Sequence, residues 1–210
     1  MILSGYIFYY ISALLGISIG YHRYFTHRTF QTTPILEHLM LFFGQICGGR
    51  SVLTWAAVHR MHHAKSDTEH DPHSPVYKGA WNVLTSRWTV DYIPKKYITD
   101  LIKNSRVVFY HKYGKYIHLV YALIMLTFSL ETFVSFVVIP FVLSWIGFGV
   151  LNYFAHRHGQ PENILLLNLI APGEGWHQEH HLHPSAARLH KYDIAGVIIE
   201  KIITKSKPSS

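Results

Sequence analysis

The sequence contains a single cysteine and few acidic residues. Cys47 stands alone, which excludes an internal disulfide, a cysteine-ligated iron–sulfur cluster and c-type haem attachment. Asp and Glu number 12 against 19 Lys and Arg, and charged residues make up 15% of the 210 residues. The zinc-protease motif H-E-x-x-H is absent. The soluble di-iron bundle needs Glu-x-x-His on two helices, whereas the one match here, Glu174 to His177, contains Gly175.

Lys and Arg are missing from two long apolar stretches, residues 2–21 and 116–155. The first has the length of one bilayer crossing, about 20 residues. It lacks the basic start and cleavage site of a signal peptide, so we expect a permanent span. The second has one acid, Glu131, near its middle, which predicts a helical hairpin (spans about 116–130 and 133–155) turning around residues 129–132. Pro140 is expected to kink or thin the returning helix.

The remaining segments are predicted to lie on one side of the membrane. Residues 35–57 are apolar but interrupted by polar residues, and we expect an interfacial or buried helix there. All Lys and Arg fall in residues 22–115 and 156–210, which the positive-inside rule places in the cytoplasm. The apolar and basic residues of 184–204 alternate at helical spacing, which suits a helix on the membrane surface.

The predicted fold class is therefore all-α, in one domain covering residues 1–210. It is an integral membrane, multi-pass protein with about three transmembrane helices and a cytoplasmic helical cap. The net charge of +7 reflects this asymmetry and attraction to anionic lipid head groups. No nucleic-acid partner is expected, because no known binding module is present.

Histidine is abundant, with 17 residues, and more than half lie in four short clusters. Residues three or four apart share a helix face, and neutral imidazole binds iron, zinc, copper and nickel. His22 and His27 are five apart, about 140° around an α-helix, and are expected to straddle a site or mark the end of the first span. The clusters are H-x4-H (His22, His27), H-x2-H-H (His59, His62, His63), N-x3-H (Asn152, His156) and H-x2-H-H (His177, His180, His181).

Nine imidazoles exceed what one metal ion takes, so two ions are predicted. Ligand imidazoles usually need a partner on the other ring nitrogen. The candidate partners are Asp67, Glu69, Asp71, Glu174 and Glu179, with His70, His73 and His183 as further orienting neighbours. Trp55, Trp81, Trp88 and Trp176 are candidates for lining a substrate tunnel.

The four ordered clusters resemble the histidine boxes of the membrane-bound fatty acid desaturases, in the Δ9, stearoyl-CoA desaturase-like branch. Asp71-Pro-His73 is similar to the Asp-Pro-His that follows the second box, which is the first H-x2-H-H cluster. Gly173-Glu-Gly-Trp-His177 is similar to the start of the third box, which is the second H-x2-H-H cluster; the N-x3-H cluster is not numbered as a box. The resemblance implies two iron ions held by the nine histidines, with Asn152 contacting metal through a water. It also implies O2 as co-substrate and a cis double bond placed in a fatty acyl chain.

The same resemblance implies two partners, a fatty acyl donor and an external electron carrier of the ferredoxin or cytochrome b5 type. The donor could be linked to CoA, acyl-carrier protein or lipid, because Ala57 and Val58 replace the Arg-Asp of animal acyl-CoA enzymes. The chain is also shorter than animal members, and Gln178 replaces an Asn of the third box. The implied location is the bacterial inner membrane or endoplasmic reticulum, with the metal site on the cytoplasmic face.

Three alternatives stay open from the residues alone. A related hydroxylase or acetylenase would use the same boxes. A non-catalytic metal-binding membrane protein would need the histidines but no acyl donor. Imidazole also accepts zinc, which can replace iron in recombinant material.

Overall fold

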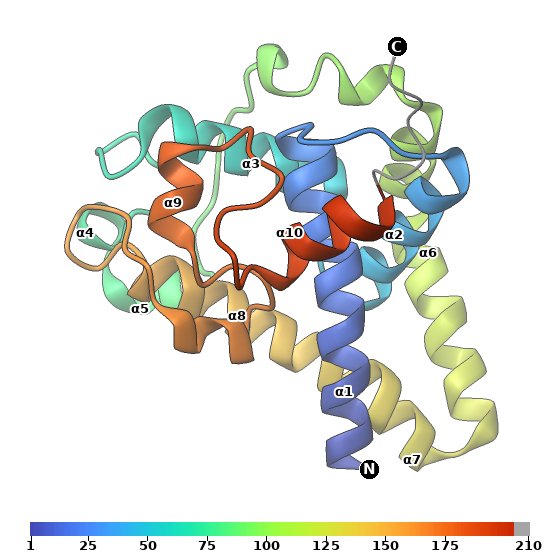
Figure 1. Ribbon diagram of the computed structural model, residues 1–210. Helices are drawn as coiled ribbons and strands as arrows, with labels where there is room; N and C mark the ends of the chain where they lie inside the picture. The colour runs from blue at the N-terminus through green and yellow to red at the C-terminus, as the bar shows by residue number, and fades with distance from the viewer. Residues whose placement is uncertain (204–210) are drawn as a thin grey trace.

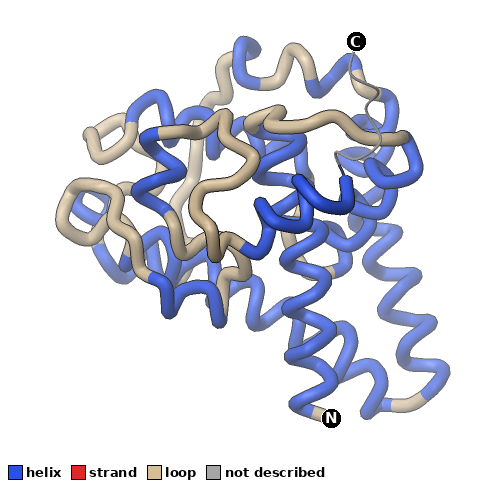
Figure 2. The backbone as a smooth tube through the Cα atoms, viewed as in Figure 1, coloured by secondary structure: helices blue, strands red, loops and turns tan. Residues whose placement is uncertain are grey.

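The computed structural model describes residues 1–203, which form helices and loops with no β-strand in that range (Figures 1 and 2). The predicted all-α class is therefore confirmed. Figure 1 shows α1, α7 and the end of α6 in a narrower lower part, with most of the other elements gathered above them.

The first helical segment consists of α1 (Ile2–Ser12) and its π-helical continuation η1 (Ala13–Thr26). Together they are long and apolar enough to cross a membrane, as predicted for residues 2–21. The helix extends five residues beyond the predicted span, so His22 lies within it. A π-helix has i→i+5 hydrogen bonds, and its geometry decides how the first two histidines meet.

The predicted helix over 35–57 is two helices, α2 (Pro34–Ile46) and α3 (Val52–Lys65), separated by a loop. Thr33 caps the N-terminus of α2, and Pro34 is its first residue. In the loop after α2, Gly48 has a φ of +97°, a backbone conformation that glycine adopts more readily than other residues. The 13 residues of α2 cover about 20 Å, less than the roughly 30 Å bilayer core. α2 packs closely on η1, where a Cβ on Gly16 would lie 2.1 Å from the Gly44 nitrogen.

The predicted hairpin is formed by α6 (Ser105–Phe128) and a returning segment of α7 (Leu130–Phe133), η4 (Val134–Val138) and α8 (Ile139–Phe154). Ser129 makes the turn, and its Oγ accepts a hydrogen bond from the Thr132 amide at 3.0 Å. Pro140 lies in the first turn of α8, directly after the π-helical η4. Residues 130–154 are long and apolar enough to cross a membrane, whereas α6 begins in a basic stretch.

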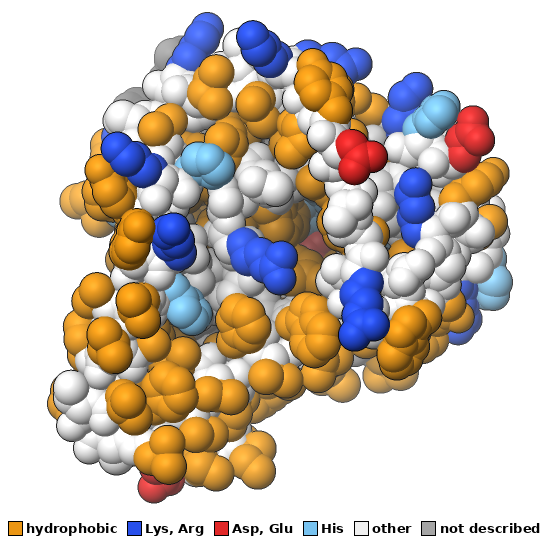
Figure 3. Space-filling model, turned by 180° about the vertical axis from the view of Figure 1, so that it is seen from behind, with side chains coloured by type: hydrophobic (Ala, Val, Ile, Leu, Met, Phe, Trp, Pro, Cys, Tyr) orange, Lys and Arg blue, Asp and Glu red, His pale blue; other side chains and the backbone are white. Residues whose placement is uncertain are grey.

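Exposed apolar side chains cover the hairpin and the start of α1. Such a large apolar surface is unusual for a soluble monomer and fits a membrane protein. Seen from behind, Figure 3 shows apolar side chains over the narrower lower part and most Lys and Arg above it. The exposed side chains include Ile2, Leu3, Ile7, Leu119, Leu123, Ile124, Phe128, Leu130, Phe141 and Trp145.

Short helices complete the fold. They are α4 (Pro75–Lys78), α5 (Ala80–Leu84), η2 (Lys95–Tyr97), η3 (Leu101–Lys103), η5 (Leu165–Leu169), α9 (His177–Leu182), α10 (Ile194–Ile198) and η6 (Ile199–Ile203).

The predicted surface helix over 184–204 is wrong in extent, because residues 184–193 are loop and turn. Asp193 starts the helix instead, accepting a hydrogen bond from the Gly196 amide at 3.2 Å. Ala195, Gly196 and Ile199 are buried, so this segment packs into the fold; residue 204 lies outside the described residues.

Candidate metal centre

His22 and His27 meet because η1 is a π-helix. The His27 amide donates to the His22 carbonyl at 3.1 Å, which places the two residues one π-turn apart. Their ring centroids are 5.1 Å apart. The expected angular separation of about 140° applies to an α-helix, whereas here the two imidazoles lie on one face. Of the two predicted alternatives, the structure bears out the second, because His27 caps the end of η1.

The second and third boxes lie on α3 and α9, where i, i+3 and i+4 spacing brings their histidines together as predicted. On α3, the Nε2 atoms of His59 and His63 are 3.1 Å apart. On α9, the Nε2 atoms of His177 and His181 are 3.2 Å apart.

The nine predicted histidines come together in two groups whose nitrogens lie within 4.8 Å of one another. His180 joins the first group, with its Nε2 2.9 Å from that of His22 and 2.8 Å from that of His63. In the second group, the Nε2 atoms of His156 and His177 are 2.8 Å apart. The groups are His22, His27, His59, His63 and His180, and His62, His156, His177 and His181.

Three of the five predicted carboxylate partners contact a box histidine through Nδ1. Glu174 lies 2.8 Å from His22, Asp71 2.9 Å from His62, and Asp67 3.0 Å from His156. All three carboxylates are at least nine-tenths shielded from solvent. A carboxylate that accepts a hydrogen bond from Nδ1 keeps the imidazole proton on that atom. The lone pair of Nε2 then faces the other imidazoles of the same group.

The other predicted partners do not contact the boxes in this way. Glu69 is exposed and lies 3.5 Å from His70, while Glu179 accepts a 3.5 Å hydrogen bond from Asn163. His70 and His183 are exposed. His73 is buried and stacks on the His62 ring with centroids 4.3 Å apart.

Burial favours the neutral form of several box imidazoles on α3 and α9. Desolvation lowers the pKa of His63 to about 3, with neighbouring His22 adding to the effect. It also lowers the pKa of His59, His62 and His180 well below the ordinary value. Neutral imidazole is the form that binds metal.

The donor set fits metal cations on electrostatic grounds. Where the carboxylates hold a proton on Nδ1 of His22, His62 and His156, the Nε2 lone pair of each faces an Nε2 atom of a second imidazole at 2.9, 3.3 and 2.8 Å. A cation bound among these nitrogens would be stabilised by several lone pairs at once. Nε2 of His27 is buried without a hydrogen-bond partner among the described residues. Two groups of imidazole nitrogen suit iron or zinc and exclude the oxygen-rich sites of calcium and magnesium.

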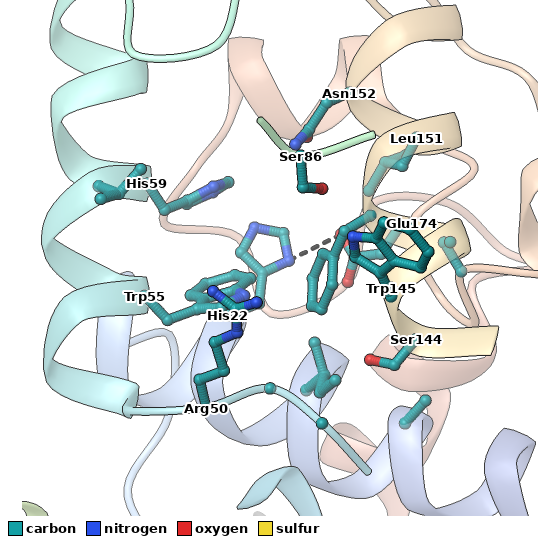
Figure 4. A pocket seen from close by; sticks show the side chains of 18 of the residues that line it. His22, Arg50, Trp55, His59, Ser86, Ser144, Trp145, Leu151, Asn152 and Glu174 are labelled. Carbon is teal, nitrogen blue, oxygen red and sulfur yellow. Dashed lines mark ion pairs between the residues drawn. The ribbon is translucent and has the colours of Figure 1, made fainter. Parts of the chain in front are cut away.

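A largely apolar cavity of about 350 Å³ adjoins both groups. η1 and α8 form much of its wall, through residues such as Ile17, Trp145 and Phe148. Figure 4 shows His22 and His59 on one side and the Asn152 amide pointing in from α8. Its volume falls within the range of small-molecule sites, about 300–1,000 Å³.

Two of the four predicted tunnel tryptophans, Trp55 and Trp88, line this cavity. Trp81 is exposed, and Trp176 stacks on His190 with centroids 3.8 Å apart. The lining residues of α8, such as Phe141 and Trp145, were not identified from the sequence. No charge or motif separates them from the other apolar residues of the same helix.

The fold and site together define a helical protein with two segments apolar enough to cross a membrane and two largely buried imidazole groups beside an apolar cavity. A family model described as fatty acid desaturase matches residues 1–207. The chain is 30% identical over 195 residues to the sn-1 stearoyl-lipid 9-desaturase of Anabaena variabilis, covering 86% of this chain and 71% of that protein.

Other relatives give similar figures. The sn-2 palmitoyl-lipid 9-desaturase of Nostoc sp. (strain 36) is 29% identical over 191 residues, covering 83% of this chain and 67% of the relative. The acyl-CoA C20 Delta5-desaturase of Anemone leveillei is 29% identical over 203 residues, covering 86% of this chain and 62% of the relative.

The chain belongs to the fatty acid desaturase family. It is accordingly an oxidoreductase, an acyl desaturase that introduces a double bond into a fatty acyl chain. The predicted similarity to the Δ9 branch is confirmed by the lipid 9-desaturases among its relatives.

Proposed function

We propose that the protein is a di-iron, O2-dependent desaturase in which the two imidazole groups each bind one iron ion. The observation that carries this proposal is the convergence of nine imidazoles, from segments up to 158 residues apart, into groups of five and four. Asn152, at the cavity wall, is suited to contact the metal through a water. Bound iron would supply the O2-activating chemistry that side chains alone lack.

The residues of the chain have three tasks in this reaction. Asp67, Asp71 and Glu174 fix the orientation and tautomer of His156, His62 and His22. The cavity orients the acyl chain beside both groups and excludes water from the reacting methylenes. Its wall on η1 and α8 faces the part of the molecule that we place in the membrane.

We propose a lipid-linked acyl donor. Ala57 and Val58 lie on α3 where a charged pair is expected for CoA recognition. Four of the relatives are named as lipid desaturases, among them the protein that is 30% identical over 195 residues, and four as acyl-CoA desaturases. A second hollow, which shares Arg50 and Ser51 with the cavity, supports a polar head group beside the acyl chain.

This second hollow carries positive charge without acidic neighbours. Its charged lining residues are Arg50, Lys112 and Lys115, and it contains no Asp or Glu. None of the three has an ion-pair partner among residues 1–203. Such a surface suits the phosphate of an anionic head group.

The proposed topology has three spans, with the boxes and the chain's basic residues on the cytoplasmic face, in a bacterial inner membrane or the endoplasmic reticulum. Electrons would come from a separate carrier of the ferredoxin or cytochrome b5 type. An exposed basic surface on the cytoplasmic side suits an acidic carrier.

Expression in a host followed by fatty acid methyl ester analysis tests this function. A new cis-unsaturated species supports it, whereas a hydroxy acid or an acetylenic product would identify a related reaction. Purified protein should then be supplied with acyl-lipid, acyl-CoA and acyl-carrier protein donors carrying the same chain. Absence of any O2-dependent product from iron-loaded protein with all three donors would favour a non-catalytic metal-binding protein.

A further inference from the structure

Each of the first two boxes contains an arginine directly after its first histidine, at Arg23 and Arg60. Among the described residues, neither guanidinium donates a hydrogen bond to a box imidazole. Each guanidinium binds at least one backbone carbonyl of a segment that carries another histidine box.

Arg60, on the second box, binds the end of the first. Its Nε and Nη2 donate to the Thr26 and Phe25 carbonyls at 3.0 and 2.9 Å. Nη1 donates to the Tyr97 carbonyl at 2.8 Å, and both Nη atoms donate to Asp100. All five N–H donors of Arg60 therefore have acceptors, and two of them hold the turn directly before His27.

Arg23, on the first box, binds the segment directly before the third. Its Nη2 donates to the Gly173 carbonyl at 3.0 Å and to Asp193, and its Nη1 donates to Ser18 Oγ at 3.1 Å. Arg23 and Asp193 are 2% and 1% exposed. A pair of this kind is buried at a large desolvation cost, so it requires a close fit.

Two adjacent residues of the first box contact two adjacent residues before the third box. His22 contacts Glu174 while Arg23 contacts Gly173. Gly173 has a φ of +83°, and a Cβ there would lie 2.4 Å from Ser18 Oγ. The backbone before the third box can therefore sit this close to η1 only with glycine. Asp193 also accepts from the Leu189 and Gly196 amides, which ties α10 to the same place; Figure 1 shows α10 beside this helix.

We propose that Arg23 and Arg60 are positioning residues that brace the three histidine boxes against one another. Arg60 links the second box to the first, and Arg23 links the first box to the third. These contacts hold the imidazoles in place from outside the groups, whether or not metal is bound. The proposal rests on the metal ligands assigned under the proposed function. Arg23 acts through Gly173 and Glu174, and Arg60 through the turn before His27.

Lysine substitutions test the braces. Arg23→Lys and Arg60→Lys keep the charge but lose the planar fork, so one ammonium cannot serve the same set of acceptors. Arg188→Lys is the matched control, because Arg188 binds the Glu200 carboxylate and the His190 and Lys191 carbonyls but no box residue. Each purified chain is titrated with Co²⁺, measuring stoichiometry, affinity and the visible absorption spectrum.

We expect wild type and Arg188→Lys to bind two Co²⁺ with the same spectrum. Arg23→Lys and Arg60→Lys should bind at least one ion about 10- to 100-fold more weakly, with an altered spectrum, as for other residues that orient ligands. Unaltered affinity and spectrum in both variants would overturn the proposal. Failure of wild type to bind two ions would instead overturn the assigned ligand set.

A buried pair can also be replaced on both sides, which separates bracing from folding. Arg23→Met/Asp193→Asn removes both charges but keeps an acceptor for the Leu189 and Gly196 amides. It is expected to be more stable than Arg23→Met alone, which leaves the Asp193 charge buried without its partner. In the double variant the Gly173 carbonyl still lacks the hydrogen bond from Arg23, so the contact between the first box and the segment before the third is lost. Weak Co²⁺ binding in a stable double variant supports the brace; wild-type affinity in that variant would show that the pair serves folding alone.

Discussion

The Nδ1 atom of His22 lies 2.8 Å from Oε2 of Glu174, so the first histidine box and the carboxylate before the third box are in direct contact. The pair spans 152 residues of sequence and is buried. Equivalent contacts join His62 to Asp71 and His156 to Asp67. Three imidazoles are thus oriented by carboxylates from outside the groups.

Removing one of these carboxylate charges should weaken metal binding. Asp71 is fully buried and accepts hydrogen bonds from the Asp67 and His73 amides as well as contacting His62. We expect Asp71→Asn to lower iron affinity about 10- to 100-fold, measured by chelator competition. Glu69→Gln, two residues away and exposed, is the control; equal losses in both variants would contradict the specific role of Asp71.

The two groups should lose metal separately. His180 belongs to the group of five and His62 to the group of four. Removing one ligand is expected to lower the iron content of its own group, while both variants, His180→Ala and His62→Ala, lose desaturated product. Iron per chain and methyl ester analysis check this, with His70→Ala as an exposed control. Full activity in either variant would remove that residue from the ligand set.

The Arg60–Asp100 contact should make stability depend on pH. Burial alone would raise the pKa of Asp100, but hydrogen bonds from Arg60 and Arg28 outweigh it and lower the pKa to about 2. The pKa of Asp100 in the folded protein is below its unfolded value of about 3.9. The contact therefore contributes its full stabilisation of the folded state above about pH 3.9, and this stabilisation is lost as the pH falls through about 2. In metal-free protein, Asp100→Asn should melt earlier than wild type at pH 6, and the difference should shrink below pH 4. A difference that grows on acidification would rule out this explanation.

The basic hollow predicts a preference for phosphate-bearing donors. Hydrogen bonds to charged groups contribute about 1.5–3 kcal/mol, so Arg50→Gln should lower the use of an acyl phospholipid about 10-fold or more. Product formation should be measured against donor concentration for an acyl phospholipid, an acyl-CoA and a neutral glycolipid. Lys96→Gln, which lies outside both hollows, is the control. A matching loss with the neutral donor would show that Arg50 does not recognise phosphate.

Much of the fold was predictable because charge and hydropathy are local properties. The stretch 116–155, with one acid and no Lys or Arg, indicates a hairpin, and the turn does form at Ser129. The surface helix over 184–204 was wrong because spacing alone does not show that residues 184–193 lie in a loop. There, Arg188 and Asp193 bind backbone groups and end the helical pattern.

The sequence by itself indicated the candidate metal ligands of the second and third boxes, since imidazoles at i, i+3 and i+4 share a helix face wherever that helix lies. It also narrowed the orienting carboxylates to five, of which Asp67, Asp71 and Glu174 contact box histidines. Only the tertiary structure decided how nine imidazoles divide into five and four, because that division depends on contacts between distant segments. The π-helix that brings His27 over His22 was likewise decided by the structure, since five-residue spacing places the pair on one face in that conformation and apart in an α-helix.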